Sequence, residues 1–197
     1  EYFNFFWFVW PAITIMVLAN LYYKEGLYAV GLLPIDFKKC FRERLEQLIG
    51  AAGLVLIFGF WFGNLHVSIT GGADSWLRFL IGALLFFLKY CLVGFLQKYA
   101  LNGFLANRLA LFWGSEKDDR VALTAAYIFG IVHLPNWFLM VVTSVGGYFC
   151  VKIFLKYRNL YFLGLAHAVI GVLLFYAVPE NITHHFATGI KYFTFDY

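Results

Sequence analysis

The chain has 197 residues, of which 62% are hydrophobic and only 13% are charged. Soluble domains have about 45–50% apolar and about 25% charged residues, and so few charges cannot cover the surface of a water-soluble domain of this size. The composition therefore excludes an ordinary soluble domain and predicts an integral membrane protein, for which the lipid bilayer is the first partner. The net charge of +4 indicates orientation in the membrane and not a nucleic-acid partner.

The apolar residues lie in long continuous runs. Such runs are typical of membrane helices, whereas a membrane barrel needs alternating segments of about ten residues. Three runs reach the roughly 20 residues that a span requires, and the others have to tilt or borrow neighbouring residues. We expect a single domain over residues 1–197, an all-α helical bundle with six to eight transmembrane helices. In chain order the runs are 2–23, 48–62, 76–96, 121–134, 137–151 and 160–178.

Three further segments are more polar than these runs. Residues 24–47 have an amphipathic pattern with Pro34 and Asp36 as a start signal, so we expect an interfacial helix there. Residues 97–113 indicate a less apolar helix, and residues 179–197 a polar and aromatic tail.

Lysine and arginine are unevenly distributed among the polar segments. Residues 35–47 carry four, residues 97–120 carry four and residues 152–158 carry three, whereas residues 63–75 carry none. Because basic loops stay on the cytoplasmic side of a membrane, we expect the first three segments to be cytoplasmic and both termini to face outward. We expect a multi-pass protein of a bacterial inner, or cytoplasmic, membrane.

The sequence offers little for metal binding. The cysteines, Cys40, Cys91 and Cys150, form no CxxC pair and no spacing typical of a metal site. His184 and His185 are adjacent in the tail, where a solvated tail is a simpler interpretation than a metal site. We therefore expect no metal site and no cofactor.

Three polar clusters interrupt the apolar runs. Polar and ionisable side chains are costly inside a membrane, so each cluster is a hypothesis for a functional site. The clusters are Gln97-Lys98 followed by residues 102–105, residues 129–133, and residues 165–171 with His167 at their centre.

In order and spacing, these clusters resemble the three signature motifs of the CAAX-protease and bacteriocin-processing family, also called CPBP or Abi proteins. Those motifs are EExxxR, FxxxH, and HxxxN or HxxxD. Asn102-Gly103-Phe104-Leu105 stands where the family has Arg-Gly-Phe-Leu, and Phe129 to His133 is followed by Leu134-Pro135. The resemblance covers residues 28–178, and it implies a CAAX-protease-like bundle that hydrolyses a peptide bond in or near the membrane.

The sequence departs from the family at the residues that carry this chemistry. The two glutamates of the first motif fall on Gln97 and Lys98, its arginine falls on Asn102, and the asparagine of the third motif falls on Gly171. In the chemistry that the resemblance implies, a glutamate activates water with the help of histidines. A general base must accept a proton, which Gln97 cannot do and Lys98 does only in its neutral form.

Phe129, His133 and His167 keep the residues of the family's motifs. The two histidines are candidates for a remnant site that holds water or a metal. Two histidines without a carboxylate or a third ligand make a poor zinc site, so hydrogen-bonded histidines at helix contacts are the simpler interpretation.

The loss of the first-motif carboxylates favours a catalytically impaired pseudoprotease, which keeps the scaffold and binds another membrane protein. Two alternatives stay open. One is an active intramembrane endopeptidase with altered machinery, formed by Lys98, His133 and His167. The other is a lipid- or cofactor-binding subunit of a larger membrane complex, since neutral imidazole can bind haem iron or a pigment metal, although no spacing here requires it.

One feature of the expected topology conflicts with a common site. Simple alternation of spans places Gln97 near the inner end of one run and His133 near the outer end of the next. A shared site requires either that residues 97–113 re-enter the bilayer or that the run 121–134 is tilted or deeper.

Overall fold

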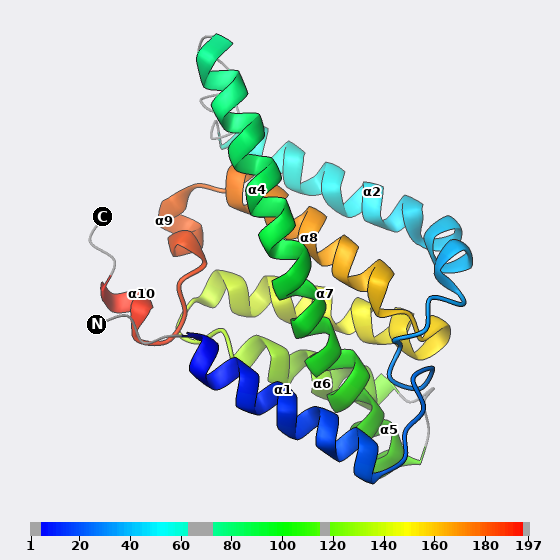
Figure 1. Cartoon of the computed structure of the whole chain (residues 1–197). Helices are drawn as coiled ribbons and strands as arrows, with labels where there is room; N and C mark the ends of the chain where they lie inside the picture. Colours follow the sequence, from blue (N-terminus) through cyan, green and yellow to red (C-terminus); the bar gives the residue numbers. More distant parts are fainter. Residues whose placement is uncertain (1–4, 63–72, 115–118, 195–197) are drawn as a thin grey trace.

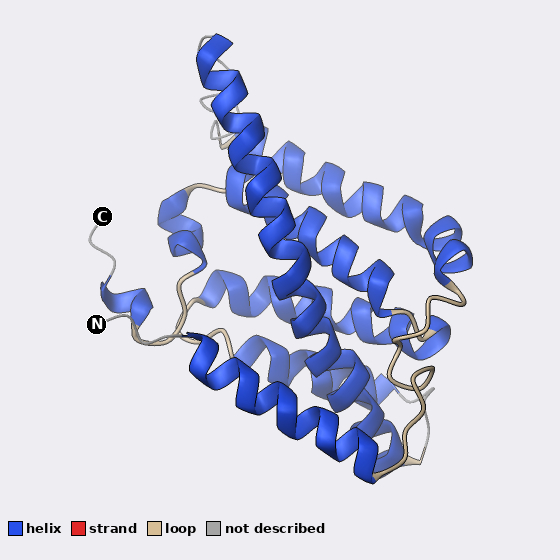
Figure 2. Cartoon of the chain, in the orientation of Figure 1, coloured by secondary structure: helices blue, strands red, loops and turns tan. Residues whose placement is uncertain are grey.

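The structure is a computed structural model of the chain that describes residues 5–62, 73–114 and 119–194. These residues form helices joined by loops and turns, with no strand among them (Figures 1 and 2). The long elements are α1 (Phe5–Tyr22), α2 (Phe37–Trp61), α4 (Ala73–Lys98), α6 (Asp119–Ile131), α7 (Trp137–Tyr157) and α8 (Leu160–Ala177). The short elements are the π-helical segment η1 (Tyr99–Ala106), α5 (Asn107–Trp113), α9 (Glu180–Thr183), the 3-10 turn η2 (His184–Phe186) and α10 (Lys191–Thr194).

The prediction of an all-α membrane bundle is confirmed. By length and composition, four helices of the described chain can cross a membrane, and Trp10–Tyr22 is a shorter apolar helix. This number is lower than the six to eight helices expected from the sequence. Two pairs of expected elements merge into single helices, and α6 has only 13 residues. The four candidate spans are Phe37–Trp61, Leu80–Trp113, Trp137–Tyr157 and Leu160–Ala177.

The first merger is in α2. The expected interfacial helix 24–47 does not form as a separate element, because residues 24–36 make turns and the helix starts at Phe37. It then continues without a break to Trp61, since no proline interrupts it and glycines are tolerated inside a helix that packing supports.

The second merger joins α4, η1 and α5 into one continuous rod (Figure 1). Gln97 and Lys98 do not end the helix, because nothing after them breaks it. The rod passes through the π-helical segment instead, a geometry that often marks functional sites. Gln97 therefore lies well inside a long helix, and the conflict expected from simple alternation does not arise.

Helix α8 lies between α4 and α2, and α6 pairs with α7 (Figure 1). Small residues allow the close approach of α8 to both neighbours. A Cβ atom on Gly59 of α2 would lie 2.4 Å from Cβ of Ala177, and one on Gly164 would lie 3.4 Å from the Phe95 side chain.

A polar network ties the ends of α1, η1, α5 and α7 together, and we call it the polar clamp. Asn20 Nδ2 donates to the Tyr99 hydroxyl at 2.8 Å, and Arg108 Nη2 donates to Asn20 Oδ1 and to Glu25 Oε2, both at 3.0 Å. Asn107 Nδ2 donates to the Ala29 carbonyl at 3.0 Å. Arg158 donates to the same carbonyl at 3.1 Å and to Asn107 Oδ1. The clamp consists of Asn20, Glu25, Tyr99, Asn107, Arg108 and Arg158.

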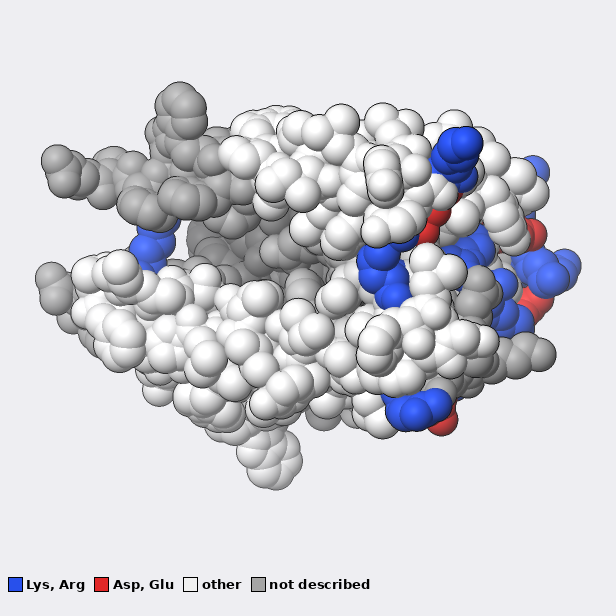
Figure 3. Space-filling model, turned by 90° about the horizontal axis from the view of Figure 1, so that it is seen from below, with Lys and Arg blue, Asp and Glu red and all other residues white. Residues whose placement is uncertain are grey.

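Charged side chains gather toward one end of the molecule (Figure 3). At this end α2 begins and α7 turns into α8 (Figure 1), so the basic residues of 35–47 and 152–158 lie together. Lys156 Nζ lies 3.1 Å from Glu43 Oε2 and joins the two segments. This polarity agrees with a transmembrane orientation, and the cytoplasmic assignment of the basic segments stays a prediction.

The C-terminal segment packs against the start of α7. Asn136 caps α7 by accepting from the Leu139 N–H at 3.1 Å, and its Nδ2 donates to the carbonyls of Thr183 and Ala187 at 2.8 and 3.1 Å. His184 Nε2 lies 3.1 Å from the Tyr192 hydroxyl. The tail expected to be solvated is therefore anchored as far as it is described, because a buried amide holds two of its carbonyls.

Candidate functional site

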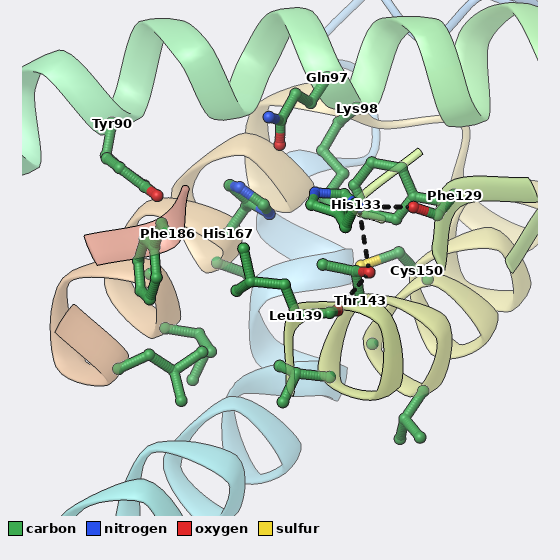
Figure 4. Close-up of a pocket in the computed structure, with 18 of the residues that line it drawn as sticks. Tyr90, Gln97, Lys98, Phe129, His133, Leu139, Thr143, Cys150, His167 and Phe186 are labelled. Atoms are coloured by element: carbon green, nitrogen blue, oxygen red, sulfur yellow. Dashed lines mark hydrogen bonds between the residues drawn. The ribbon is translucent and has the colours of Figure 1, made fainter. Parts of the chain in front are cut away.

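A cavity of about 1910 Å³ is lined by α2, α4, α6, α7, α8 and the C-terminal segment. Ligand pockets usually enclose about 300–1,000 Å³, so this cavity has room for a large or extended apolar molecule. Six of the seven residues singled out in the sequence line it, and Figure 4 shows five of them with their neighbours. The six are Gln97, Lys98, Phe129, His133, His167 and Gly171.

Lys98 is the basic side chain in the middle of the site. It is only 2% exposed, and Nζ lies 4.9 Å from the centre of the Phe129 ring, in a cation–π arrangement. Figure 4 shows it extending from the rod toward Phe129 and His133. Within the described chain it forms no hydrogen bond or ion pair.

His133 lies in the turn after α6. Its Nδ1 is 2.6 Å from the Phe129 carbonyl and 3.3 Å from Thr143 Oγ1. The carbonyl oxygen can only accept, so Nδ1 must carry the proton. Thr143 Oγ1 in turn donates to the Leu139 carbonyl at 2.6 Å. These contacts fix the ring orientation and leave Nε2 available.

His167 comes from α8. Its ring lies parallel to that of Tyr90, with centroids 6.0 Å apart and an interplanar angle of 8°. A Cβ atom on Gly94 would lie 2.7 Å from His167 Cδ2. The glycine therefore makes the room in which the imidazole sits.

Asn102 is the one motif position that does not line the cavity. It is fully buried in η1, and neither its Nδ2 nor its Oδ1 has a hydrogen-bond partner among the described residues. Gln97 Oε1 is also buried without a partner. Both amides stand where the resemblance places charged residues, and the structure pairs neither.

The model of the family "Type II CAAX prenyl endopeptidase Rce1-like" matches residues 79–173. That part of the chain is similar to this family of endopeptidases. The resemblance drawn from the sequence motifs is confirmed over this segment. No curated protein and no solved structure gives a significant match to the chain.

The Rce1-like motifs therefore converge on one cavity, but without a carboxylate. No Asp or Glu occurs among the described residues that line it, whereas Arg44, Lys98 and Lys191 do. A metal ion is equally hard to place, because the described residues contain no group of three or more His, Cys, Asp or Glu suited to hold one. What the arrangement offers is a cation, two imidazoles and long apolar walls.

The third Rce1-like motif is altered together with its surroundings. A Cβ atom on Gly171 would lie 2.4 Å from Cε1 of Tyr90. The Tyr90 ring thus occupies the place next to residue 171, and an asparagine does not fit there unless the ring moves. Gly171 and Tyr90 are a matched pair in this chain.

Among the lining residues that sequence reasoning did not assign to a site are Tyr90, Thr143, Cys150 and Phe186. Thr143 had a usable signal, a polar side chain in an apolar run at helical spacing from Leu139. Tyr90 and Phe186 had none, because aromatic residues are common throughout the sequence. Phe186 approaches Tyr90, with ring centroids 6.2 Å apart, so the C-terminal segment contributes to the site.

Proposed function

We propose that the chain is a CAAX-protease-like membrane protein that acts by binding and not by hydrolysis, a pseudoprotease that holds another membrane protein. One observation carries the proposal: the described lining of the cavity has no carboxylate near His133 and His167. Activation of water needs a base that accepts its proton.

The roles of the remaining polar groups support this proposal. His133 is held by the Phe129 carbonyl and Thr143, and the amide of Gln97 cannot accept a proton. General-base catalysis contributes typically about 10²–10⁴-fold to rate. Without the carboxylate of the motif, the atom of His133 left to accept a proton is Nε2, which is why the test below compares the chain with its His133→Ala variant. The scaffold and its cavity stay available for binding.

The direct test is cleavage of a membrane peptide by the purified full chain in mild detergent. An active CAAX protease in the same micelles is the positive control. We expect the chain to release no more product than its His133→Ala variant. Cleavage that His133→Ala abolishes would show that the chain is a protease.

The partner is tested separately by purification of the chain in mild detergent and mass spectrometry of all co-purifying proteins. We expect one membrane protein in stoichiometric amount. A chain that purifies alone, from a membrane extract that keeps known complexes intact, would contradict the scaffold role.

An active endopeptidase is the second candidate, and the position of Lys98 favours it. Its Nζ lies over Phe129, the residue whose carbonyl holds His133, so a neutral Lys98 would stand next to an imidazole. In this version Lys98→Met abolishes cleavage and Lys89→Met, on the exposed side of the same helix, leaves it intact.

A further inference from the structure

We propose that the cavity binds an anionic lipid, whose carboxylate or phosphate head lies against Lys98 and whose alkyl chain runs along the apolar faces of α7 and α8. This inference goes beyond the proposed function, which concerns a membrane-protein partner, and assigns a ligand to the cavity itself.

Charge is the first argument. Lys98 is almost completely buried and forms no ion pair within the described chain. A cation in an apolar cavity is costly unless an anion accompanies it, and the described lining contains no Asp or Glu to provide one. An anionic group of a ligand provides the missing charge.

Two histidines lie beside Lys98 and offer further polar contacts to a head group. With Nδ1 of His133 committed to the Phe129 carbonyl, Nε2 is the ring atom left for a ligand. His167 lies on the other side, against the Tyr90 ring (Figure 4). Lys98 donates to an oxyanion of the head group, whereas Nε2 of neutral His133 is an acceptor and suits a hydroxyl of the same head group.

The walls are the second argument. On α7 the lining residues run from Leu139 to Ile153, which corresponds to about 21 Å at the helical rise per residue. One leaflet of a bilayer core is about 15 Å thick, so the wall is long enough for a lipid chain. Both walls are built mainly of apolar side chains, among them Val142 of α7 and Leu163 and Ile170 of α8.

These walls favour a lipid over a peptide. An extended peptide exposes an N–H and a C=O at each residue, and each such group needs a partner in an apolar site. Between Thr143 and Ile153 the α7 wall offers only Cys150 as a weak donor. An alkyl chain needs no such partners.

The head group is tested by equilibrium binding of labelled lipids to the purified full chain in nanodiscs of neutral lipid. Oleate and oleoyl lysophosphatidate carry a carboxylate and a phosphate, while oleyl alcohol and oleoyl lysophosphatidylcholine are matched probes without a net negative charge. We expect one or both anionic probes to bind at least about tenfold more tightly than their matched controls, as for a charge-assisted contact. Preference for one anion identifies the head group, and equal binding of the anionic and control probes would overturn the proposal.

Lys98→Met removes the charge and keeps the length of the side chain. It should weaken binding of the preferred anion by about 10- to 100-fold, the range for a lost charge-assisted contact. Lys98→Arg should retain the preference for anions. Lys89→Met removes the same charge from an exposed position of α4 and should leave binding unchanged. Unchanged binding in a folded Lys98→Met variant would overturn the proposal.

A second pair of variants tests whether the alkyl chain of the lipid lies in the cavity, and it leaves Lys98 unchanged. Gly50 and Gly53 both lie in α2, and a Cβ atom on either would meet nothing within 4 Å, but only Gly50 lines the cavity. Gly50→Leu should weaken binding of oleate and Gly53→Leu should not. Equal effects of the two variants would place the lipid outside the cavity.

Alkylation of the native cysteines locates the bound lipid. Cys150 lines the cavity, whereas Cys91 is partly exposed, does not line it and serves as the internal reference. Saturating anionic lipid should protect Cys150 from a thiol reagent, as measured by peptide mass spectrometry, and lack of protection would contradict the proposed location.

Peptide cleavage by the chain would refute the pseudoprotease without affecting these results. Failure of oleate and lysophosphatidate to bind would refute this inference alone.

Discussion

The cavity and the polar clamp are built on the same rod of α4, η1 and α5. Among the described residues, most polar side chains of the clamp pair with one another, although Nε and Nη1 of Arg108 have no hydrogen-bond partner, whereas those that the rod contributes to the cavity do not pair with one another. In the clamp, Asn107 and Arg158 donate to the Ala29 carbonyl, and Arg158 also donates to Asn107 Oδ1. In the cavity, Lys98 and the Oε1 atom of Gln97 have no hydrogen-bond partner within the described chain.

This difference indicates that the polar groups of the clamp stabilise the fold, whereas those of the cavity are available to bind a ligand. Buried polar groups that pair with one another stabilise and specify a fold, and a buried polar group without a partner has a cost that a bound molecule can offset. The clamp therefore fixes the rod against α1 and α7, and the cavity keeps its polar groups for a bound molecule. Four predictions test how far this separation holds.

The largest expected effect is in the clamp. Asn107→Ala leaves the Arg158 guanidinium without its contact to Oδ1 and removes the donor to Ala29. Loss of a partner of a buried charge costs about 3 kcal/mol, so the free energy of unfolding should fall by about this amount. Unfolding of the purified chain by SDS titration in mixed micelles measures the change.

Asn102→Ala is the matched control, five residues earlier on the same rod. Its amide is fully buried without a partner, so its removal also removes a desolvation cost, and stability should stay equal or rise. A loss as large as that of Asn107→Ala would show that Asn102 pairs with a group in the native protein, and the separation would fail there.

The next effect concerns the altered third motif. Gly171→Asn restores the family's residue but brings a Cβ atom within 2.4 Å of the Tyr90 ring. Overpacking of this kind costs about 1–3 kcal/mol. In a Tyr90→Ala background the same substitution should cost much less, which a double-mutant cycle of unfolding free energies detects. Equal costs in both backgrounds would mean that residue 171 and Tyr90 are not coupled.

A smaller effect is expected at the two helix caps formed by asparagine. Asn136 and Asn159 both accept from a helix N–H through Oδ1, but only Asn136 uses its Nδ2, on Thr183 and Ala187. Serine keeps the capping oxygen and removes the amide donor. Asn136→Ser should lower the unfolding free energy by about 1–2 kcal/mol, the sum of two ordinary hydrogen bonds.

Asn159→Ser serves as the control for this pair, with little expected change in stability. The tail anchored by Asn136 contributes Phe186 and Lys191 to the cavity, so Asn136→Ser should also speed alkylation of Cys150. Equal destabilisation by the two serine variants would show that the tail is not held by Asn136.

The helices themselves were largely predictable from the sequence. The run 160–178 became α8 (Leu160–Ala177), and the run 137–151 became the first part of α7, because proline and polar residues flank both. The three motifs indicated the residues of the cavity, because order and spacing along the chain are preserved when a fold is kept.

What the sequence could not predict depends on contacts between distant elements. The sequence predicted helix boundaries at 47–48 and 96–97, where the structure has continuous helices. Hydropathy changes at these positions, but helix formation continues through them. The pairing of Tyr90 with Gly171 joins α4 to α8, and no local pattern contains such a pair. The clamp was missed for the same reason, since Asn20 and Tyr99 are 79 positions apart.

The smallest effect is expected at the surface, where charge pairing exists without burial. Lys152 and Asp119 form an ion pair, but their side chains are 45% and 61% exposed. Exposed pairs contribute at most about 1 kcal/mol and are screened by salt. Lys152→Met should therefore change the unfolding free energy by less than Asn107→Ala does, and its effect should vanish in high salt while that of Asn107→Ala persists. If both effects vanish together, water reaches the clamp, and its polar groups are not held apart from solvent as the contrast with the surface requires.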